Sequence, residues 1–285
     1  PLCISNTFSF IYGVHMHDSD DKKPIVEYSS DALDFFSDRH ATTHASFLLP
    51  FLNQGMTVLD CGCGPGTITL DLAEFVYPGD VTGIDIAPTQ IKTAKTLQSQ
   101  SKIQNVRFEI GDVNALEFPN ESFDLVFAHG VIEYLEDPVH AFKEIRRVLT
   151  NDGKIAVRHA DWGGFLLAPK NEDIELFFSL FKQLMMHDEG DIFFGRNQIS
   201  YLRQAGFNLL KISASYDCWT PSPEITQKVA SYMASHCLSD EFMKPVIDLN
   251  LSDKPTLERI SNSFLEWGTN PDAFAAEAWG EAIAS

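Results

Sequence analysis

The sequence is poor in basic residues. Its 285 residues include 21 Lys and Arg against 40 Asp and Glu, which gives a formal net charge of −19 at pH 7. Because an acidic surface repels phosphate backbones, this composition argues against DNA or RNA as a partner and favours a small-molecule ligand.

Cysteines and long apolar runs are also scarce. The five cysteines form no array typical of disulfides, and Cys61 and Cys63 have no second pair at zinc-site spacing. No apolar run approaches the ~20 residues of a membrane-spanning helix, and no secretory signal precedes the first strand. We therefore expect reduced thiols, no metal, no membrane span and a cytoplasmic location. Residues 13–21 resemble a metal-binding tract, but within the polar segment 1–27 they are more typical of a flexible acidic arm.

The stretch around which the chain is organised is M-T-V-L-D-C-G-C-G-P-G-T, residues 56–67. A β-prone run leads into Gly62, Gly64 and Gly66, and apolar residues at a spacing of four follow. The pattern predicts a strand, a tight turn and a helix, which together bring bare backbone to a ligand beside a helix N-terminus. The dinucleotide fingerprint G-x-G-x-x-G would need a glycine where Thr67 stands. The pattern D-x-G-x-G-x-G instead resembles the glycine loop of class I methyltransferases, which use S-adenosylmethionine.

Strand and helix patterns alternate as far as residue 160 and predict an α/β fold with a Rossmann-like, doubly wound, mostly parallel sheet. Helical additions are expected before the sheet, as an insertion and at the C-terminus. The expected helices include 41–52, 88–100, 138–149, 257–267 and 274–283, and the expected strands after the first are 81–85, 106–110, 123–128, 154–159 and 207–215. We expect a single domain over 28–285, with a cofactor core at 40–160 and helical covers at about 161–206 and 220–285.

The resemblance extends over residues 28–162. VLDCGCGPGTIT, VTGIDIAP, GDVNALEFPNESFDLVFAHGVIEYLEDP and LTNDGKIAVRHADW are similar, in order and spacing, to motifs of the ubiquinone/menaquinone-biosynthesis branch of class I methyltransferases. The helical tail and the aromatic insertion are also similar to fungal secondary-metabolite methyltransferases, including dithiol S-methyltransferases of the gliotoxin type. The family's sheet has a seventh, antiparallel strand, which this sequence pattern does not place after residue 215. Either the C-terminal helices replace it or the chain is cut short.

Residues at the strand ends would hold the cofactor. Asp85 can accept hydrogen bonds from both ribose hydroxyls, although it could instead cap the next helix. Asp60 would orient the glycine loop or receive the ligand's ammonium group through water, Asp112 would accept from an adenine amino group, and Ile86 would cover the adenine or belong to the core. In the family an Arg of an N-terminal helix pairs with the ligand carboxylate, and Arg39 occupies the corresponding place. The complete set of expected cofactor contacts is Arg39, Asp60, Gly62, Cys63, Gly64, Asp85, Ile86, Gln90, Gly111, Asp112, Val113, Ala128, His129 and Gly130.

The reaction that the resemblance implies is an in-line displacement at the methyl carbon of a sulfonium, with S-adenosylhomocysteine as the product. Alignment alone can supply most of the rate, but a hydroxyl nucleophile is helped by a base, for which His129 and His159 are the candidates. An apolar metabolite would bind among the aromatic residues Tyr28, Phe36, Trp162, Phe193, Phe194 and Trp219. Two alternatives stay open at this point: a non-catalytic adenosylmethionine-binding protein and a nucleotide-cofactor oxidoreductase.

Overall fold

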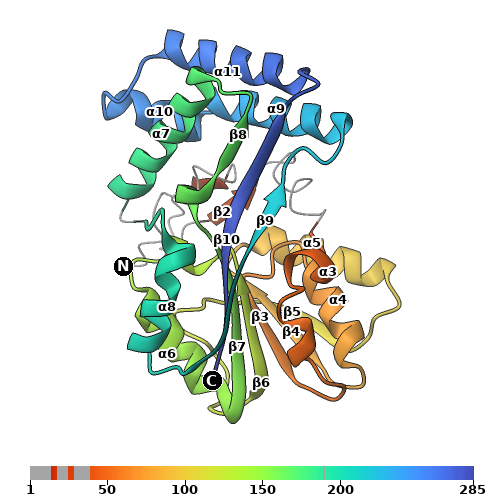
Figure 1. The fold of residues 1–285 in the computed structure, drawn as a ribbon. Coiled ribbons are helices and arrows are strands. Elements are labelled where there is room, and N and C mark those ends of the chain that lie inside the picture. Colours follow the sequence, from red (N-terminus) through yellow and green to blue (C-terminus); the bar gives the residue numbers. More distant parts are fainter. Residues whose placement is uncertain (1–13, 18–24, 29–38, 189) are drawn as a thin grey trace.

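The computed structural model describes residues 14–17, 25–28, 39–188 and 190–285, and within them a mixed eight-stranded sheet carries helices on both faces (Figure 1). The strands lie in the order β5-β4-β3-β6-β7-β10-β8, and β9 also pairs with β10. Their bounds are β3 (Val58–Cys61), β4 (Val81–Asp85), β5 (Val106–Ile110), β6 (Phe123–His129), β7 (Leu149–Ala160), β8 (Leu166–Ala168), β9 (Leu209–Cys218) and β10 (Phe274–Ala284). β3 to β7 pair in parallel, whereas β10 is antiparallel to each of its partners. The predicted Rossmann-like, mostly parallel fold is therefore confirmed.

The two faces of the sheet bury alternate residues of the same strands. Val58 and Phe127 pack on the face that carries α3 (Ala41–His44), α4 (Thr67–Val76) and α5 (Pro88–Gln100). Leu59 and Ala128 pack on the other face, against α6 (Pro138–Val148) and α8 (Phe194–Gln204). Because both faces are covered, β3 and β4 are buried at every position, as central parallel strands should be.

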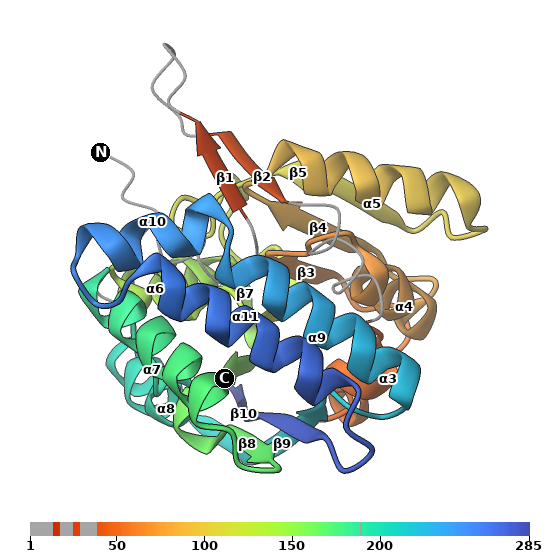
Figure 2. The ribbon, with the colours of Figure 1, turned by 90° about the horizontal axis from the view of Figure 1, so that it is seen from above.

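A third helical layer lies over the carboxyl ends of the parallel strands (Figures 1 and 2). It consists of α7 (Glu172–His187), α9 (Pro223–Cys237), α10 (Asp240–Asp248) and α11 (Lys254–Gly268), which share one aromatic-rich core with Trp279 of β10. No helix in the described part of the chain is long and apolar enough to cross a membrane. The aromatic-rich core of this helical layer covers the carboxyl ends of the strands with apolar side chains.

The prediction of a helix over 274–283 is wrong, because these residues form β10. Alanine-rich composition favours a helix, but this segment lies between β7 and β9 and is buried along most of its length. Gly280 lies so close to Gly195 of α8 that an added Cβ would fall 1.9 Å from the Gly195 carbonyl oxygen. Tertiary packing has therefore overridden local propensity. β10 also supplies the antiparallel strand that the sequence pattern did not place, so it is neither replaced by helices nor missing.

Other segments also differ from expectation. The helix expected at 41–52 is divided: α3 ends at His44, and a separate 3₁₀ turn, η1 (Leu49–Phe51), contains Pro50. β7 begins at Leu149 instead of after a turn at 151–153, and an irregularity in its pairing with β6 accommodates the additional residues. In the segment 1–27, which was expected to be a flexible arm, the described residues form the strand β1 (Val14–His17) and most of the strand β2 (Ile25–Tyr28), which pair antiparallel.

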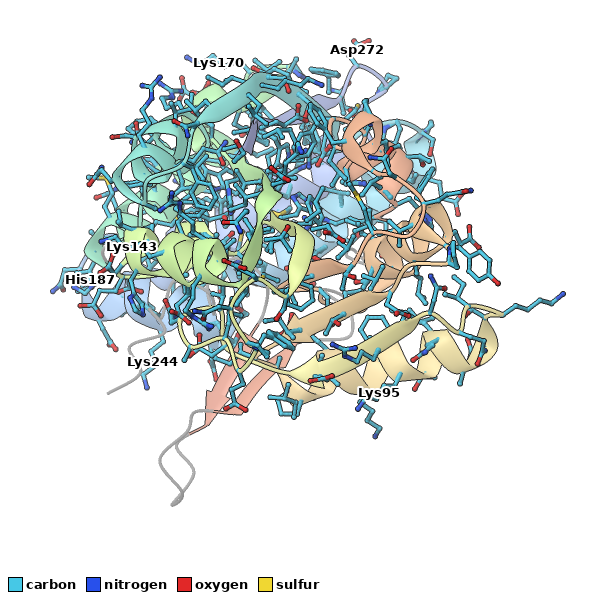
Figure 3. The ribbon with its side chains drawn as sticks, turned by 90° about the horizontal axis from the view of Figure 1, so that it is seen from below. Lys95, Lys143, Lys170, His187, Lys244 and Asp272 are labelled. Carbon is cyan, nitrogen blue, oxygen red and sulfur yellow. The ribbon has the colours of Figure 1, made fainter. Side chains whose placement is uncertain are left out.

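Four lysines in the described part of the chain lie apart from one another on the surface. Lys95 of α5, Lys143 of α6, Lys170 before α7 and Lys244 of α10 project outward at well-separated places around the molecule (Figure 3). These four cations therefore make no common basic face.

Candidate functional site

The glycine loop follows β3 and turns on left-handed backbone. Gly62, Gly64 and Gly66 have φ values of +73°, +54° and +85°, a region that other residues rarely adopt. The backbone N–H groups of Gly62 and Cys63 donate to the Ile84 carbonyl at 2.8 and 2.9 Å. A Cβ added at Gly62 would fall 2.1 Å from a methyl carbon of Val131. The loop is therefore held tightly against β4 and the segment after β6.

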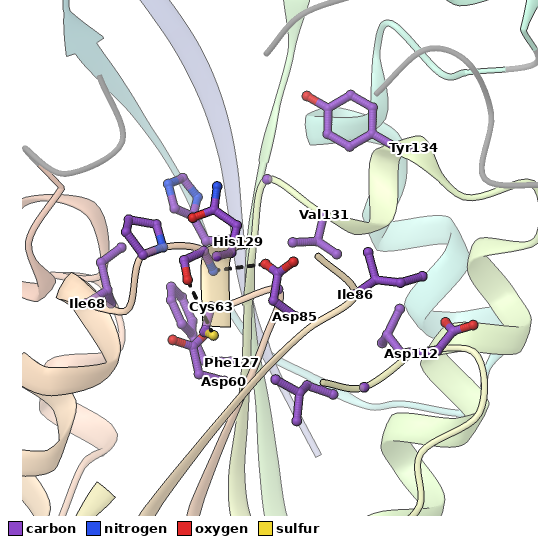
Figure 4. Close-up of a pocket in the computed structure, with 18 of the residues that line it drawn as sticks. Asp60, Cys63, Ile68, Asp85, Ile86, Asp112, Phe127, His129, Val131 and Tyr134 are labelled. Carbon is purple, nitrogen blue, oxygen red and sulfur yellow. Dashed lines mark hydrogen bonds between the residues drawn. The ribbon is translucent and has the colours of Figure 1, made fainter. Parts of the chain in front are cut away.

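Asp85, at the end of β4, ties this loop to the start of α5. Its Oδ2 accepts from the Gly64 N–H at 3.0 Å (Figure 4). Its Oδ1 accepts from the Ala87 N–H at 2.8 Å. Burial raises the pKa of its carboxyl to about 6, although both hydrogen bonds act in the opposite direction. Each oxygen retains a further lone pair, so the carboxylate can still accept from a bound hydroxyl.

Asp60 is the second buried carboxyl beside the loop. Its Oδ2 accepts from the Thr69 hydroxyl at 2.6 Å. Burial, and then the nearby charge of Asp85, raise the pKa of Asp60 to about 7, while the Thr69 hydrogen bond lowers it. Since Thr69 belongs to α4, this contact fixes the loop between its strand and its helix.

These residues line a pocket at the carboxyl ends of β3, β4, β5 and β6, which we name the strand-end pocket (Figure 4). Every residue expected to contact a cofactor lines it, with the exception of Ala128. The side chain of Ala128 lies in the core of the opposite face because neighbouring strand residues alternate. Further lining residues that the sequence analysis did not include are Pro65, Thr67, Ile68, Ile84, Asn114, Phe127, Val131, Tyr134 and Leu135. Strand alternation could have identified Phe127, which lies two residues before His129.

Two buried polar atoms of the strand-end pocket lack a hydrogen-bond partner among the described residues: Gln90 Oε1 and His129 Nε2. His129 Nδ1 lies 3.1 Å from the Arg158 carbonyl, so it is the protonated nitrogen and donates there. Burial and neighbouring cations hold the pKa of His129 well below its usual range, and the ring is neutral. Both orphaned atoms are therefore acceptors, which a ligand carrying N–H or O–H groups would satisfy.

His159, the other candidate base, does not lie in this pocket. Its side chain is completely buried; Nδ1 is 2.9 Å from Gln198 Oε1, and Nε2 accepts from the Ile132 N–H at 3.3 Å. Burial lowers its pKa to about 4. Because both ring nitrogens are occupied inside the core, the structure does not bring His159 to the site.

A second, smaller cavity lies under the helical layer and is predominantly aromatic. We name it the aromatic cavity; its lining residues are Arg39, Trp162, Phe177, Phe178, Phe181, Trp219, Val229, Tyr232, Met233, His236 and Glu277. Trp162 and Trp219 were expected at an apolar binding site. Arg39 was expected as a cofactor contact. The remaining lining residues were not expected, because they come from α7, α9 and β10, and only the fold brings these elements together.

Of the four other residues expected around the substrate, two are described with their side chains, and neither lines this cavity. Phe194 is completely buried against His159 and Tyr201. Phe193 is exposed and lies beneath the Arg196 guanidinium. Phe36 lies outside the described residues, and only the backbone of Tyr28 is described.

Within the described residues, no group of three or more His, Cys, Asp or Glu side chains is placed to hold a metal ion. The side chains of the tract at 13–21 fall outside the described set. The described cysteines are all free, and Cys61, Cys63 and Cys237 are buried.

Comparison with known proteins gives one family match. A family described as "Methyltransferase domain" matches residues 52–205, which is more than half of the chain. An uncharacterized methyltransferase, C1B3.06c of Schizosaccharomyces pombe, is 26% identical over 84% of this chain and 89% of its own length. The 2-methyl-6-phytyl-1,4-hydroquinone methyltransferase of Synechocystis is 35% identical over 54% of this chain, but only 46% of that enzyme is matched.

Among solved structures, the [4+2]-cyclase SpnF has a similar fold, with a TM-score of 0.55 and 19% identity over 96% of this chain and 87% of its own. This similarity concerns the fold alone, because one fold supports different reactions.

Proposed function

The chain belongs to the family of methyltransferase domains, and from this premise we propose that it transfers a methyl group from S-adenosylmethionine to a small, fairly apolar metabolite. When bound, S-adenosylmethionine supplies a methyl group on a positively charged sulfur, which leaves as a neutral thioether. The observation that carries the proposal is the strand-end pocket, where a glycine loop, a buried Asp85 and two orphaned acceptors converge.

The chain's own residues would hold this cofactor by their chemistry. Asp85 would accept from the ribose hydroxyls while it fixes the loop. Asp112 would accept from the adenine amino group. Arg39, which lines the same pocket, would pair with the carboxylate of the cofactor. His129 Nε2 is a neutral acceptor suited to an ammonium group. Once these residues hold the cofactor, the rest of the site has to exclude water and align the methyl acceptor.

Within the family we place the chain in the ubiquinone/menaquinone-type branch, which its motifs and its identity to the hydroquinone methyltransferase support. A fungal secondary metabolite, including a dithiol of the gliotoxin type, is a second candidate acceptor that an aromatic cavity can receive. We also place the protein in the cytoplasm, as its cysteine pattern predicts. We assign it no nucleic-acid partner, because its net charge is −19.

Calorimetric titration with S-adenosylmethionine and S-adenosylhomocysteine tests the proposal. We expect micromolar binding of both ligands, and about tenfold weaker binding by Asp85→Asn as a charge-assisted hydrogen bond to the ribose is lost. Asp124→Asn is the matched control: Asp124 accepts from the Thr57 N–H at 2.9 Å at the opposite ends of the strands. Its affinity should equal that of the wild type.

If the wild type binds neither ligand, the proposal fails. Binding without transfer to any of a broad range of acceptors would favour the non-catalytic alternative, and hydride transfer with added NAD would favour the oxidoreductase.

A further inference from the structure

Three cavities meet at one arginine. Arg39 lines the strand-end pocket, the aromatic cavity and a third, more open cavity of about 820 Å³, which we name the outer cavity. The aromatic and outer cavities also share Trp219, Val229, Tyr232 and Glu277. A molecule that enters through the outer cavity and inserts into the aromatic cavity therefore lies next to the strand-end pocket.

Glu277 is the one carboxyl group in the described lining of the aromatic cavity. It lies on β10 with 4% of its surface exposed, two residues before Trp279 and therefore on the same face of the strand. The Trp279 ring is 4.6 Å from the ring of His129, measured between centroids, and 5.7 Å from the guanidinium carbon of Arg39. Glu277 is thus separated from the strand-end pocket by about one side chain.

The surroundings of Glu277 favour its neutral form. Burial is the first cause that raises its pKa, to about 8, and the second is Asp217, which stands directly opposite on β9. Asp217 is itself paired with Arg158, which donates to both of its oxygens at 2.6 and 3.1 Å. The other titratable or charged groups around Glu277 are Arg39, His44, Glu133, Arg158, Lys228, Tyr232 and His236.

The aromatic cavity also holds a polar atom without a hydrogen-bond partner in the part of the chain that the structure describes. The indole Nε1 of Trp162, a residue only 4% exposed, has no hydrogen-bond acceptor among the described residues. A cavity walled by aromatic rings thus contains an orphaned donor and a buried carboxyl. The Trp219 side chain already donates to Glu277, but a carboxyl group can accept more than one hydrogen bond. A planar, apolar molecule with a hydroxyl group and a second oxygen could therefore donate to Glu277 and accept from Trp162.

We propose that Glu277 recognises the hydroxyl group of a planar, apolar methyl acceptor in the aromatic cavity and takes its proton during transfer. This inference rests on the proposed function. The acceptor's O–H bond breaks toward a Glu277 oxygen; its oxygen forms a bond to the methyl carbon of the sulfonium donor, and the C–S electron pair remains on sulfur. The carboxylate becomes a carboxylic acid and later releases the proton to water.

The first test measures recognition without turnover. The complex with S-adenosylhomocysteine is dialysed to equilibrium against 2-naphthol and against 2-fluoronaphthalene, which has a similar shape but no O–H group. We expect the wild type to hold 2-naphthol about tenfold more tightly, and Glu277→Leu to remove this preference. Glu281→Gln is the control, since Glu281 is equally buried on the same face but binds Ser213 and Ser215 and lines none of the three cavities.

Equal affinity of the wild type for the two naphthalenes overturns the inference, and so does a preference that survives in Glu277→Leu. A wild type that binds no S-adenosylhomocysteine contradicts the proposed function instead, so the two failures are distinguishable. If Glu277→Leu does not fold, equal affinity of the wild type for the two naphthalenes still overturns the inference, and Glu277→Gln in the second test addresses the residue itself.

The second test concerns the proton. Methylation of 2-naphthol should rise with pH to a plateau above about pH 8 in the wild type, and Glu277→Gln should lower its rate about 100-fold and abolish that rise. 2-Naphthalenethiol, which ionises more readily, should be much less affected. Equal losses for both acceptors, or no methylation of bound 2-naphthol, overturn the assignment of Glu277 as the base.

Discussion

The strand-end pocket and the aromatic cavity lie side by side but are built in opposite ways. The first consists of short segments at the ends of adjacent strands, and its glycine loop brings backbone to the ligand. The second consists mainly of side chains from α7, α9 and β10, elements that lie up to about one hundred residues apart along the chain. A site made of backbone needs particular residues at fixed local spacing, whereas a site made of side chains needs only that distant elements pack together. Local sequence motifs therefore define the first site and not the second.

The two sites also treat buried carboxyl groups differently. Asp85 accepts from two backbone N–H groups and Asp60 accepts from a hydroxyl, so both are fixed by the loop that they support. Glu277 faces Asp217 across the β9–β10 ladder, an arrangement of like charges that is unfavourable when both are ionised. The carboxyls of the strand-end pocket hold the glycine loop in place, whereas we propose that Glu277 in the aromatic cavity exchanges a proton.

The largest effect should come from the backbone of the strand-end pocket. Gly62→Ala combines a left-handed φ of +73° with a Cβ placed 2.1 Å from Val131, so we expect S-adenosylhomocysteine affinity to fall about 100-fold by calorimetry. Gly55→Ala is the matched control, since φ is +87° there but nothing lies within 4 Å of the added Cβ. It should lose some thermal stability and keep its affinity. Equal affinity losses in the two variants would mean that backbone strain alone is responsible.

Arg39→Met tests whether the two sites are coupled. Because Arg39 lines all three cavities, its loss should weaken both S-adenosylhomocysteine and 2-naphthol binding, each by about tenfold. Arg107→Met, at an exposed residue paired with Glu109, should change neither affinity. An effect on only one ligand would show that the sites function independently.

Trp219→Leu should weaken binding in the aromatic cavity and leave binding in the strand-end pocket unchanged. Trp219 lines the aromatic and outer cavities and stacks edge to face with Phe165 at 5.0 Å, but it does not line the strand-end pocket. We expect about fivefold weaker binding of 2-naphthol, measured by dialysis, and unchanged binding of S-adenosylhomocysteine. Phe75→Leu, at an exposed aromatic on α4, is the control. Weaker cofactor binding in Trp219→Leu would contradict the separation.

The smallest effect should be a change in how stability depends on pH. Burial raises the pKa of Glu277 from 4.5 to about 8, so the folded state keeps a proton that the unfolded state has lost, and the free energy of unfolding falls as pH rises through this range. Asp60 and Glu133 act in the same direction. The buried histidines have lowered pKa values, so their contribution is already complete above about pH 6.5.

Melting temperatures should therefore decrease from about pH 6.5 to about pH 8.5 in the wild type and decrease less in Glu277→Gln. Glu266→Gln removes an exposed carboxyl and should leave the slope as in the wild type. Parallel slopes for the wild type and Glu277→Gln would show that Glu277 is not the titrating group.

The sequence predicted the parallel half of the molecule better than the antiparallel half. The strands at 81–85 and 106–110 and the helix at 88–100 have the expected bounds, because Asp85 ends the first strand, Gly111 follows the second and Pro88 begins the helix. β10 was missed since its alanines favour a helix and its strand character comes only from its neighbours. Glu277 was missed with it, because a glutamate within an expected helix carries no signal for a binding site.

His129 and His159 show the same limit within the site. Both end a strand pattern, and nothing in the local sequence distinguishes them. Only the fold places His129 in the strand-end pocket and gives both nitrogens of His159 partners in the core. The position at a strand end therefore could not show which of the two histidines lies in the site.

The position of β10 also constrains how the protein can fold during synthesis. β7 and β9 are complete after residue 218, but the strand that joins them does not emerge until residues 274–284. Until then, the nascent chain exposes unpaired strand edges that could bind other chains. The parallel strands and the glycine loop can assemble in that interval, whereas Glu277 and Trp279 arrive with the last strand. A ribosome-bound chain is therefore expected to acquire its cofactor site before its acceptor site, and to depend on chaperones most in the interval between the two.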